Sequence, residues 1–230
     1  MLATYREGTI ELYRDNRFVF ISLVFVWIIS AAMLLFLNHG DEFYYINPFH
    51  SPELDVFFKY LTDLGNGLVQ ALILLPLLFF RFRVYAIFIA SHLSSGLFAQ
   101  IIKFIVDASR PHAYFSNFDF FHTVAGVSLY SHHSFPSGHT ASIFALSTVL
   151  CLVTNNKWLK FLFLLFAIVV AFSRMYLLQH FLLDVYFGSI IGVLFGVLTY
   201  LVGRAYIPKE KLLSQTIFNY IQEKRSKRAK

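Results

Sequence analysis

Six long runs of apolar residues, separated by short polar segments, set the pattern of this chain. A helix needs about 20 mostly apolar residues to cross the hydrocarbon core of a bilayer, and most of the runs approach that length. The run at 139–153 is short, and we expect the one at 68–80 to extend towards the N-terminus. The pattern predicts an all-α polytopic membrane protein, a bundle of six transmembrane helices over residues 18–37, 68–80, 84–106, 139–153, 158–173 and 182–203.

The distribution of basic residues predicts the orientation of these helices. Cytoplasmic loops of membrane proteins carry an excess of Lys and Arg. With the N-terminus placed in the cytoplasm, all but four of the 19 Lys and Arg residues fall on that side, the exceptions being Lys59, Lys103, Arg110 and Arg174. We therefore expect both the N- and C-termini to be cytoplasmic.

The chain shows no internal repeat or low-complexity linker, so we expect a single domain over residues 1–230 with its membrane core at 18–203. Ser30-Ala31-Ala32 resembles a signal cleavage site, but the apolar run continues to Leu37, and signal sequences hold about 7–15 apolar residues. We therefore expect a retained anchor. The tails at 1–17 and 208–230 are expected to be interfacial or cytoplasmic. The second is either a helix on the inner leaflet, with an apolar face of Leu213, Ile217 and Ile221, or a solvated basic segment.

Composition narrows the class of protein further. Apolar residues make up 57% of the chain and charged residues only 14%, whereas globular domains carry about 25% charged residues, which argues against a water-soluble enzyme. The 28 Phe and 13 Tyr residues exclude intrinsic disorder. The single Cys151 cannot form an internal disulfide.

Between the first two runs, Ser51-Pro52-Glu53 has the features of a helix start: an N-cap Ser, Pro at the first position and an acid in the first turn. We expect a short helix on the outer surface that ends at Gly65-Asn66-Gly67.

Three polar clusters lie at the outer ends of predicted spans three to six, where charged residues are costly and point to function. The first contains Lys103 and Arg110, which are seven residues apart. Seven residues are about two helical turns, so both cations could reach one point if the helix continues until Pro111 ends it. The alternative is two side chains that snorkel to the membrane edge.

The second cluster is Pro136-Ser137-Gly138-His139, at the start of the fourth run. A glycine lets the backbone approach a ligand, and a helix N-terminus presents free N–H groups and a positive dipole end to an anion. The Ser137 hydroxyl can add a donor. The alternative is a plain N-cap followed by an interfacial His.

The third cluster contains Arg174, His180 and Asp184. His180 and Asp184 are four residues apart and would share a helix face, where a carboxylate fixes the imidazole tautomer and leaves the other nitrogen free to attack. The alternative is a buried pair that only holds helices together. Arg binds phosphate bidentately and Lys binds it as a point charge, and no Cys or acidic cluster suggests a catalytic metal. The three clusters together favour metal-free phosphoryl transfer through a His nucleophile.

Taken together, the clusters resemble the signature motifs of the membrane-bound type 2 phosphatidic acid phosphatase superfamily, the lipid phosphate phosphatases. The order of the motifs, the six spans and the outward placement are also similar, so the resemblance covers most of the chain. The first motif is Lys, six residues and Arg-Pro; the second is Pro-Ser-Gly-His; the third is Ser-Arg, five residues, His, three residues and Asp. They match Lys103 to Arg110-Pro111, then Pro136 to His139, then Ser173-Arg174, His180 and Asp184.

The resemblance implies a role for each matching residue. His180 would be the nucleophile that forms a phosphohistidine, Asp184 would orient it, and His139 would be the general acid that protonates the leaving oxygen. The phosphate oxygens would be held by Lys103, Arg110, Ser137, Gly138 and Arg174. No metal or other cofactor is implied.

The resemblance also implies a function and a location. We expect a small bacterial enzyme of the inner membrane, with its active site facing the periplasm or exterior, that hydrolyses a lipid phosphate or pyrophosphate. Undecaprenyl pyrophosphate is the favoured substrate, and lipid A, phosphatidylglycerol phosphate and phosphatidic acid are alternatives. The expected partners are this lipid and the bilayer, with no nucleic acid; the oligomeric state stays open.

Other classes of function fit less well. An anion transporter would need cations spread through the membrane depth or inverted repeats with broken helices, and the sequence shows neither. The vanadium haloperoxidases share the phosphate pocket but are soluble, and the intact His139, His180 and Asp184 argue against an inactive homologue. We assign no role to the aromatic loop at 108–135, whose His132 and His133 we expect at the surface, or to Asp63 and Asp107.

Overall fold

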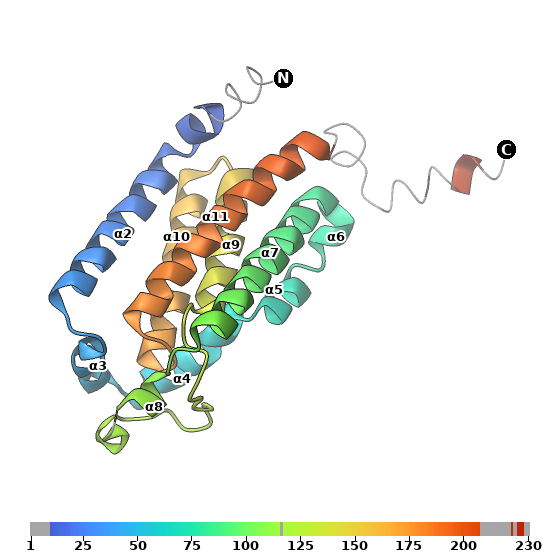
Figure 1. Cartoon of the computed structure of the whole chain (residues 1–230). Coiled ribbons are helices and arrows are strands. Elements are labelled where there is room, and N and C mark those ends of the chain that lie inside the picture. Colours follow the sequence, from blue (N-terminus) through green and yellow to red (C-terminus); the bar gives the residue numbers. More distant parts are fainter. Residues whose placement is uncertain (1–9, 116, 208–221, 223–224, 228–230) are drawn as a thin grey trace.

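The computed structural model describes residues 10–115, 117–207, 222 and 225–227. Within these residues the protein is all-helical, as predicted. Figure 1 shows the long helices side by side with similar inclinations. They are α2 (Arg17–Phe36), α7 (Phe82–Val106), α9 (Gly138–Val153), α10 (Lys157–Tyr176) and α11 (Leu182–Tyr206). The predicted C-terminal helix with Leu213, Ile217 and Ile221 lies outside the described residues.

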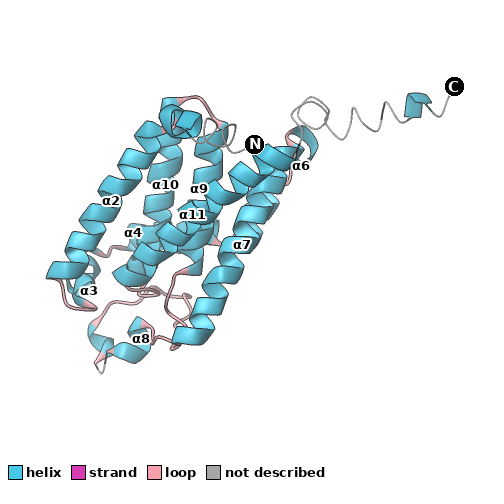
Figure 2. Ribbon diagram, turned by 45° about the horizontal axis from the view of Figure 1, so that its top comes forward, coloured by secondary structure: helices cyan, strands magenta, loops and turns pink. Residues whose placement is uncertain are grey.

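Shorter elements gather at one end of the bundle, where Figures 1 and 2 show α3, α4 and α8 together. The elements of this end are α3 (Asp41–Ile46), η1 (Asn47–Phe49), α4 (Pro52–Leu61), η2 (Thr62–Gly65), α8 (Pro111–Tyr114) and η3 (Phe118–Phe120). The predicted helix start is confirmed, because the Ser51 hydroxyl caps α4 by accepting a hydrogen bond from the Leu54 N–H at 3.3 Å. The opposite end holds an ion pair of 2.9 Å between Arg204 and Glu11.

Four of the helical segments are long and apolar enough to cross a membrane: Arg17–Phe36, Phe82–Tyr114, most of which is α7, Lys157–Tyr176 and Leu182–Tyr206. They coincide with the first, third, fifth and sixth predicted spans. The helix of the fourth predicted span, α9, has only 16 residues and is therefore about 24 Å long at 1.5 Å per residue.

The second predicted span, 68–80, is not one continuous helix. It consists of α5 (Gly67–Ile73) and α6 (Leu77–Phe80), separated by a turn at 74–76. The break has a local cause, because Pro76 has no N–H to donate and its ring excludes the carbonyl of the preceding turn. Helix length and composition therefore support four of the six predicted spans.

Helix α9 forms the centre of the bundle, since it packs against α7, α10 and α11 and is buried over most of its length. Three glycines of α11, at 188, 192 and 196, face it. A Cβ at Gly192 would lie 2.4 Å from the Ala141 carbonyl oxygen, and one at Gly188 would lie 2.7 Å from that of Ser137. Small residues at this spacing let membrane helices approach closely. The contact places the start of α9 beside the first turn of α11, where the Ser137 N–H donates to the Asp184 carbonyl at 3.0 Å.

Candidate active site

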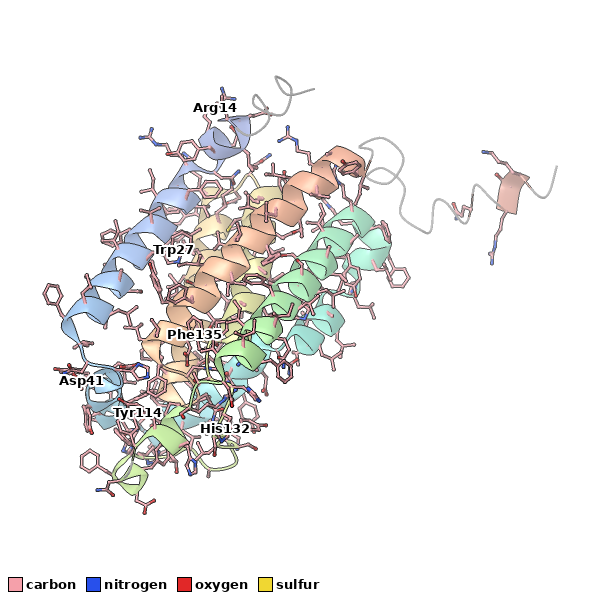
Figure 3. The ribbon with its side chains drawn as sticks, viewed as in Figure 1. Arg14, Trp27, Asp41, Tyr114, His132 and Phe135 are labelled. Atoms are coloured by element: carbon pink, nitrogen blue, oxygen red, sulfur yellow. The ribbon has the colours of Figure 1, made fainter. Side chains whose placement is uncertain are left out.

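The predicted site residues meet at the end of the bundle where the short helices gather. Figure 3 shows Tyr114 and His132 at this end and Arg14 at the other. Five separate parts of the fold contribute. Lys103 lies in the last turn of α7, Arg110 precedes α8, and Ser137 to His139 begin α9. Arg174 lies in the last turn of α10, and His180 and Asp184 flank the start of α11. The cations and His139 all lie close enough to His180 to act on its charge.

His180 and Asp184 form a buried hydrogen-bonded pair, each only 2% exposed, with 3.2 Å between His180 Nδ1 and Asp184 Oδ2. They do not share a helix face as the spacing predicts, because His180 lies in the connection before α11. The same carboxylate oxygen accepts hydrogen bonds from the Phe181 N–H at 3.0 Å and from the Ser134 hydroxyl. Because an ionised carboxylate only accepts, His180 carries its proton on Nδ1 and its lone pair on Nε2.

The surroundings of His180 oppose its protonation. Burial lowers the pKa of His180 well below its usual range, and the positive charges of Arg174, Arg110 and Lys103 lower this pKa further. A neutral imidazole at neutral pH is the form that can act as a nucleophile.

Lys103 and Arg110 reach the site by a different path from the predicted one. Helix α7 ends at Val106, and Asp107 follows with φ of 40° in the left-handed region, so the helix does not continue to Arg110. Pro111 begins α8 instead of ending a helix. The chain nevertheless turns back towards the site. Lys103 Nζ donates to the carbonyls of His133 and Ser134, and Arg110 Nε donates to the carbonyl of His132 at 3.0 Å.

Arg174 is buried with part of its hydrogen-bonding capacity unused. One terminal nitrogen, Nη1, donates to the Thr62 hydroxyl at 2.7 Å. Its Nε is buried and has no hydrogen-bond partner among the described residues. Such an orphaned donor is costly unless a ligand satisfies it, so Arg174 is poised to bind an acceptor oxygen.

The start of α9 combines a cap with open space. The Ser137 side chain accepts hydrogen bonds from the Thr140 N–H at 3.4 Å and the Thr140 hydroxyl at 2.9 Å, which leaves its own proton available. A Cβ at Gly138 would meet nothing within 4 Å, so there is room for a ligand beside the backbone. The first N–H groups of a helix have no intrahelical partner and attract anions.

Several residues that support the site were missed by the sequence analysis. Ser134 binds Asp184, Thr62 binds Arg174, and Gln179 accepts from Arg110 through its backbone carbonyl at 3.2 Å. Glu42 of α3 caps α11 by accepting from the Leu182 N–H at 2.7 Å. Gln179 lies within the third motif and Ser134 two residues before the second, whereas Thr62 and Glu42 come from distant segments. In the described part of the chain, no group of three or more His, Cys, Asp or Glu residues could hold a metal ion.

Comparison with known proteins agrees with this arrangement. Residues 84–207, more than half of the chain, match the PAP2 superfamily. The chain belongs to the PAP2 superfamily. This confirms the resemblance to the type 2 phosphatidic acid phosphatases, and the matched segment contains all three motifs. No curated protein matches the sequence.

Two solved structures are similar to this PAP2 protein. LpxE from Aquifex aeolicus is 28% identical, with a TM-score of 0.63 over 70% of this chain and 94% of LpxE. A transmembrane PAP2-type phosphatidylglycerolphosphate phosphatase from Bacillus subtilis is 20% identical, with a TM-score of 0.60 over 86% of this chain and 100% of that protein. At 20% identity, the similarity to the Bacillus subtilis protein shows that the two proteins share a fold. Together with the four apolar helices, the family supports an integral membrane protein.

Proposed function

We propose that this protein is an integral membrane phosphatase that hydrolyses a lipid phosphate or pyrophosphate at the extracytoplasmic face, without a metal. The observation that carries this proposal is the buried His180–Asp184 pair with three cations around it, one of which has an unsatisfied buried donor, Arg174 Nε. Membership of the PAP2 superfamily and the similarity to two members of known structure support it.

In the proposed mechanism, His180 is the nucleophile. Its Nε2 lone pair attacks phosphorus while Asp184 holds the proton on Nδ1 and stabilises the positive charge that develops on the ring. Lys103, Arg110 and Arg174, with the first N–H groups of α9 and the Ser137 hydroxyl, stabilise the charge on the phosphoryl oxygens. Gly138 leaves the space that these oxygens occupy. Positioning and charge stabilisation supply most of the catalysis in such a transfer.

His139 is the proposed general acid. As the N–P bond forms, the bond from phosphorus to the leaving oxygen breaks, and His139 gives that oxygen its proton. Water then attacks the phosphohistidine, a proton passes from this water back to His139, and inorganic phosphate leaves with His180 restored. His139 is half-buried and lies beside the end of η2, in contact with Gly65.

The proposed topology keeps six spans in a single domain over residues 1–230, with both termini in the cytoplasm of a bacterial inner membrane. In this proposal the broken pair α5 and α6 makes the second crossing and α9 the fourth. Both are short, but they lie against α7 and the other long helices, so neighbouring helices can satisfy their free backbone groups.

Undecaprenyl pyrophosphate is the proposed substrate. A pyrophosphate carries more negative charge than a phosphate monoester, which suits a site with the three cations Lys103, Arg110 and Arg174. Lipid A, phosphatidylglycerol phosphate and phosphatidic acid are the alternatives.

The test is phosphate release in detergent micelles with EDTA present, from each of these four lipids, for wild type and His180→Ala. We expect release that EDTA does not reduce and that falls by at least about 10³-fold in the variant, as for loss of a catalytic nucleophile. The lipid with the highest rate identifies the substrate. Release that survives in His180→Ala would contradict the mechanism, and release that stops with EDTA would contradict metal independence.

A further inference from the structure

Beneath the site, polar side chains from three helices form a chain of hydrogen bonds inside the bundle. Gln70 of α5 and His92 of α7 both contact Ser142 of α9, with Ser142 Oγ 2.9 Å from Gln70 Oε1 and 2.9 Å from His92 Nδ1. Gln70 is 2% exposed and Ser142 4%. Polar side chains at membrane depth are costly and mark functional positions, yet none of these three belongs to the motifs.

The number of protons available fixes which group donates and which accepts in this series of hydrogen bonds. Gln70 Nε2 lies 2.8 Å from the Leu64 carbonyl, which can only accept, so the amide nitrogen faces Leu64 and Oε1 faces Ser142. The Ser142 hydroxyl has one proton and gives it to Oε1, so its oxygen accepts from His92 Nδ1–H. The chain therefore runs from His92 through Ser142 and Gln70, and it ends on the backbone of η2.

The element at the end of this chain touches two residues of the site. Thr62, at the start of η2, accepts the hydrogen bond from Arg174. Gly65, at its end, packs so closely on His139 that a Cβ there would lie 3.1 Å from the His139 Cβ. Just beyond η2, the His92 ring covers Gly67, where a Cβ would lie within 2 Å of it. The segment 62–67 is thus held by the hydrogen bonds of Gln70 and the contact with His92, and it in turn contacts Arg174 and His139 of the site.

We propose that Gln70, Ser142 and His92 are positioning residues: they fix η2, and η2 fixes Arg174 and His139. This inference rests on the proposed phosphatase function and adds residues outside the family motifs to its machinery. A displacement of about 1 Å in catalytic groups can lower a rate by as much as 10²-fold, so loss of the polar chain has a kinetic effect even in a folded protein.

The main test compares Gln70→Met, which keeps the size of the side chain but removes its donor and acceptor, with wild type. We expect kcat/KM per folded molecule to fall by about tenfold, with Ser142→Ala showing a smaller loss and Ser142→Thr, which keeps the hydroxyl, restoring most of it. Combined with Thr62→Val, the loss in Gln70→Met should be smaller than the product of the two single effects, because both act through η2.

Ser189→Ala is the matched control. It removes a different hydrogen bond between helices, from Trp27 Nε1 to Ser189 Oγ at 2.9 Å, which joins α2 to α11 and does not involve η2. We expect it to lower the melting temperature without changing kcat/KM. If Gln70→Met behaves like Ser189→Ala, with lower stability and unchanged kinetics, the positioning role is wrong.

Binding of orthovanadate, a tetrahedral phosphate analogue, separates this inference from the proposed function. We measure it as the rise in melting temperature of wild type, Gln70→Met and Ser189→Ala. Weaker binding by about fivefold or more in Gln70→Met alone supports positioning of Arg174, even if no lipid is hydrolysed. Equal vanadate binding and equal kinetics in all three overturn the inference while the phosphatase function stands. A wild type that neither binds vanadate nor releases phosphate overturns both.

Discussion

At the scale of single residues, one oxygen of Asp184 holds several groups of the site together. One oxygen, Oδ2, faces His180, the Phe181 N–H and the Ser134 hydroxyl, and Ser134 Oγ also lies 3.5 Å from His180 Nδ1. Removal of the hydroxyl in Ser134→Ala leaves the carboxylate and imidazole less restrained. A hydrogen bond to a charged group is worth about 1.5–3 kcal/mol, so we expect kcat for phosphate release to fall by about tenfold with KM changed little.

The matched control for this prediction is Ser131→Ala, on the same loop. The backbone carbonyl of Ser131 accepts from the Arg110 N–H at 2.9 Å, and this bond does not depend on the side chain. Its activity should equal that of wild type. An equal loss in both variants would mean that the loop, and not the Ser134 hydroxyl, affects the rate.

The lowered pKa of His180 predicts the acid side of the pH profile. Burial and the nearby cations hold this pKa below its ordinary value, about 6.5, so the imidazole stays neutral and nucleophilic as the pH falls to that value. Activity is lost only when the pH falls through the lower pKa of the folded protein. The measurement is kcat/KM against pH, corrected for the titration of the lipid phosphate. An acid limb centred at or above 6.5 would contradict the proposed state of His180.

Sequence order alone could place the motif residues in one site but could not show what holds them. The three motifs come together because they lie at the same end of the bundle. The first is at the end of α7, the second at the start of α9 and the third between α10 and α11, as the alternating direction of the spans requires. Thr62, Ser134 and Glu42 are 112, 50 and 140 residues away from Arg174, Asp184 and Leu182, which they contact. Serine, threonine and glutamate at such distances carry no local signal of these contacts.

At the scale of elements, the contact of α9 with α11 sets the geometry of the site. Gly192 allows it, since a Cβ there would lie 2.4 Å from a backbone oxygen of α9, which cannot move without the helix. Forcing extra atoms into such a contact costs about 1–3 kcal/mol. Gly192→Ala should therefore lower the melting temperature in detergent and reduce phosphate release, because Ser137 and Asp184 separate.

Gly96→Ala is the control for this packing prediction. Gly96 lies within α7, and a Cβ there would meet nothing within 4 Å. Alanine is favoured over glycine inside a helix by about 1 kcal/mol, so this variant should be as stable as wild type or more so. If both variants melt alike, close packing at Gly192 does not control stability.

The helices themselves were predictable where apolar runs are long and uninterrupted. The predicted starts and ends of α2, α7, α9, α10 and α11 differ from the observed ones by three residues or fewer. The prediction failed at two places with local causes. Pro76 divides the run at 68–80, and the left-handed conformation of Asp107 ends α7 before Arg110. Neither conformation follows from hydrophobicity, although Pro76 was visible as a helix breaker.

At the scale of the whole molecule, the charges are separated between the two ends of the bundle. The site end holds Lys103, Arg110 and Arg174, all of which are at least partly buried. Their charges therefore face the inside of the protein and not the surface. Arg14, Arg81 and Lys157 are exposed and belong to the side that the positive-inside rule places in the cytoplasm. The site end should therefore face out of the cell.

Cysteine labelling tests this orientation, because the single native Cys151 is buried and wild type should not react. Asp119 in η3 and Asn155 between α9 and α10 are both exposed and lie at opposite ends of the bundle. A membrane-impermeant maleimide added to intact spheroplasts should label Asp119→Cys and should label Asn155→Cys only after permeabilisation. The reverse pattern would place the site in the cytoplasm.

The same reagent decides whether α5 and α6 together cross the membrane. Asp63 and Arg81, which are exposed, flank this broken pair, which spans 14 residues from Gly67 to Phe80, about 21 Å if fully helical against a core of about 30 Å. If the pair crosses, Asp63→Cys reacts from outside and Arg81→Cys only after permeabilisation. Labelling of both from outside would make α5 and α6 a re-entrant segment. Helix α7 would then begin outside the cell, whereas the distribution of basic residues places Arg81 and Arg83 in the cytoplasm.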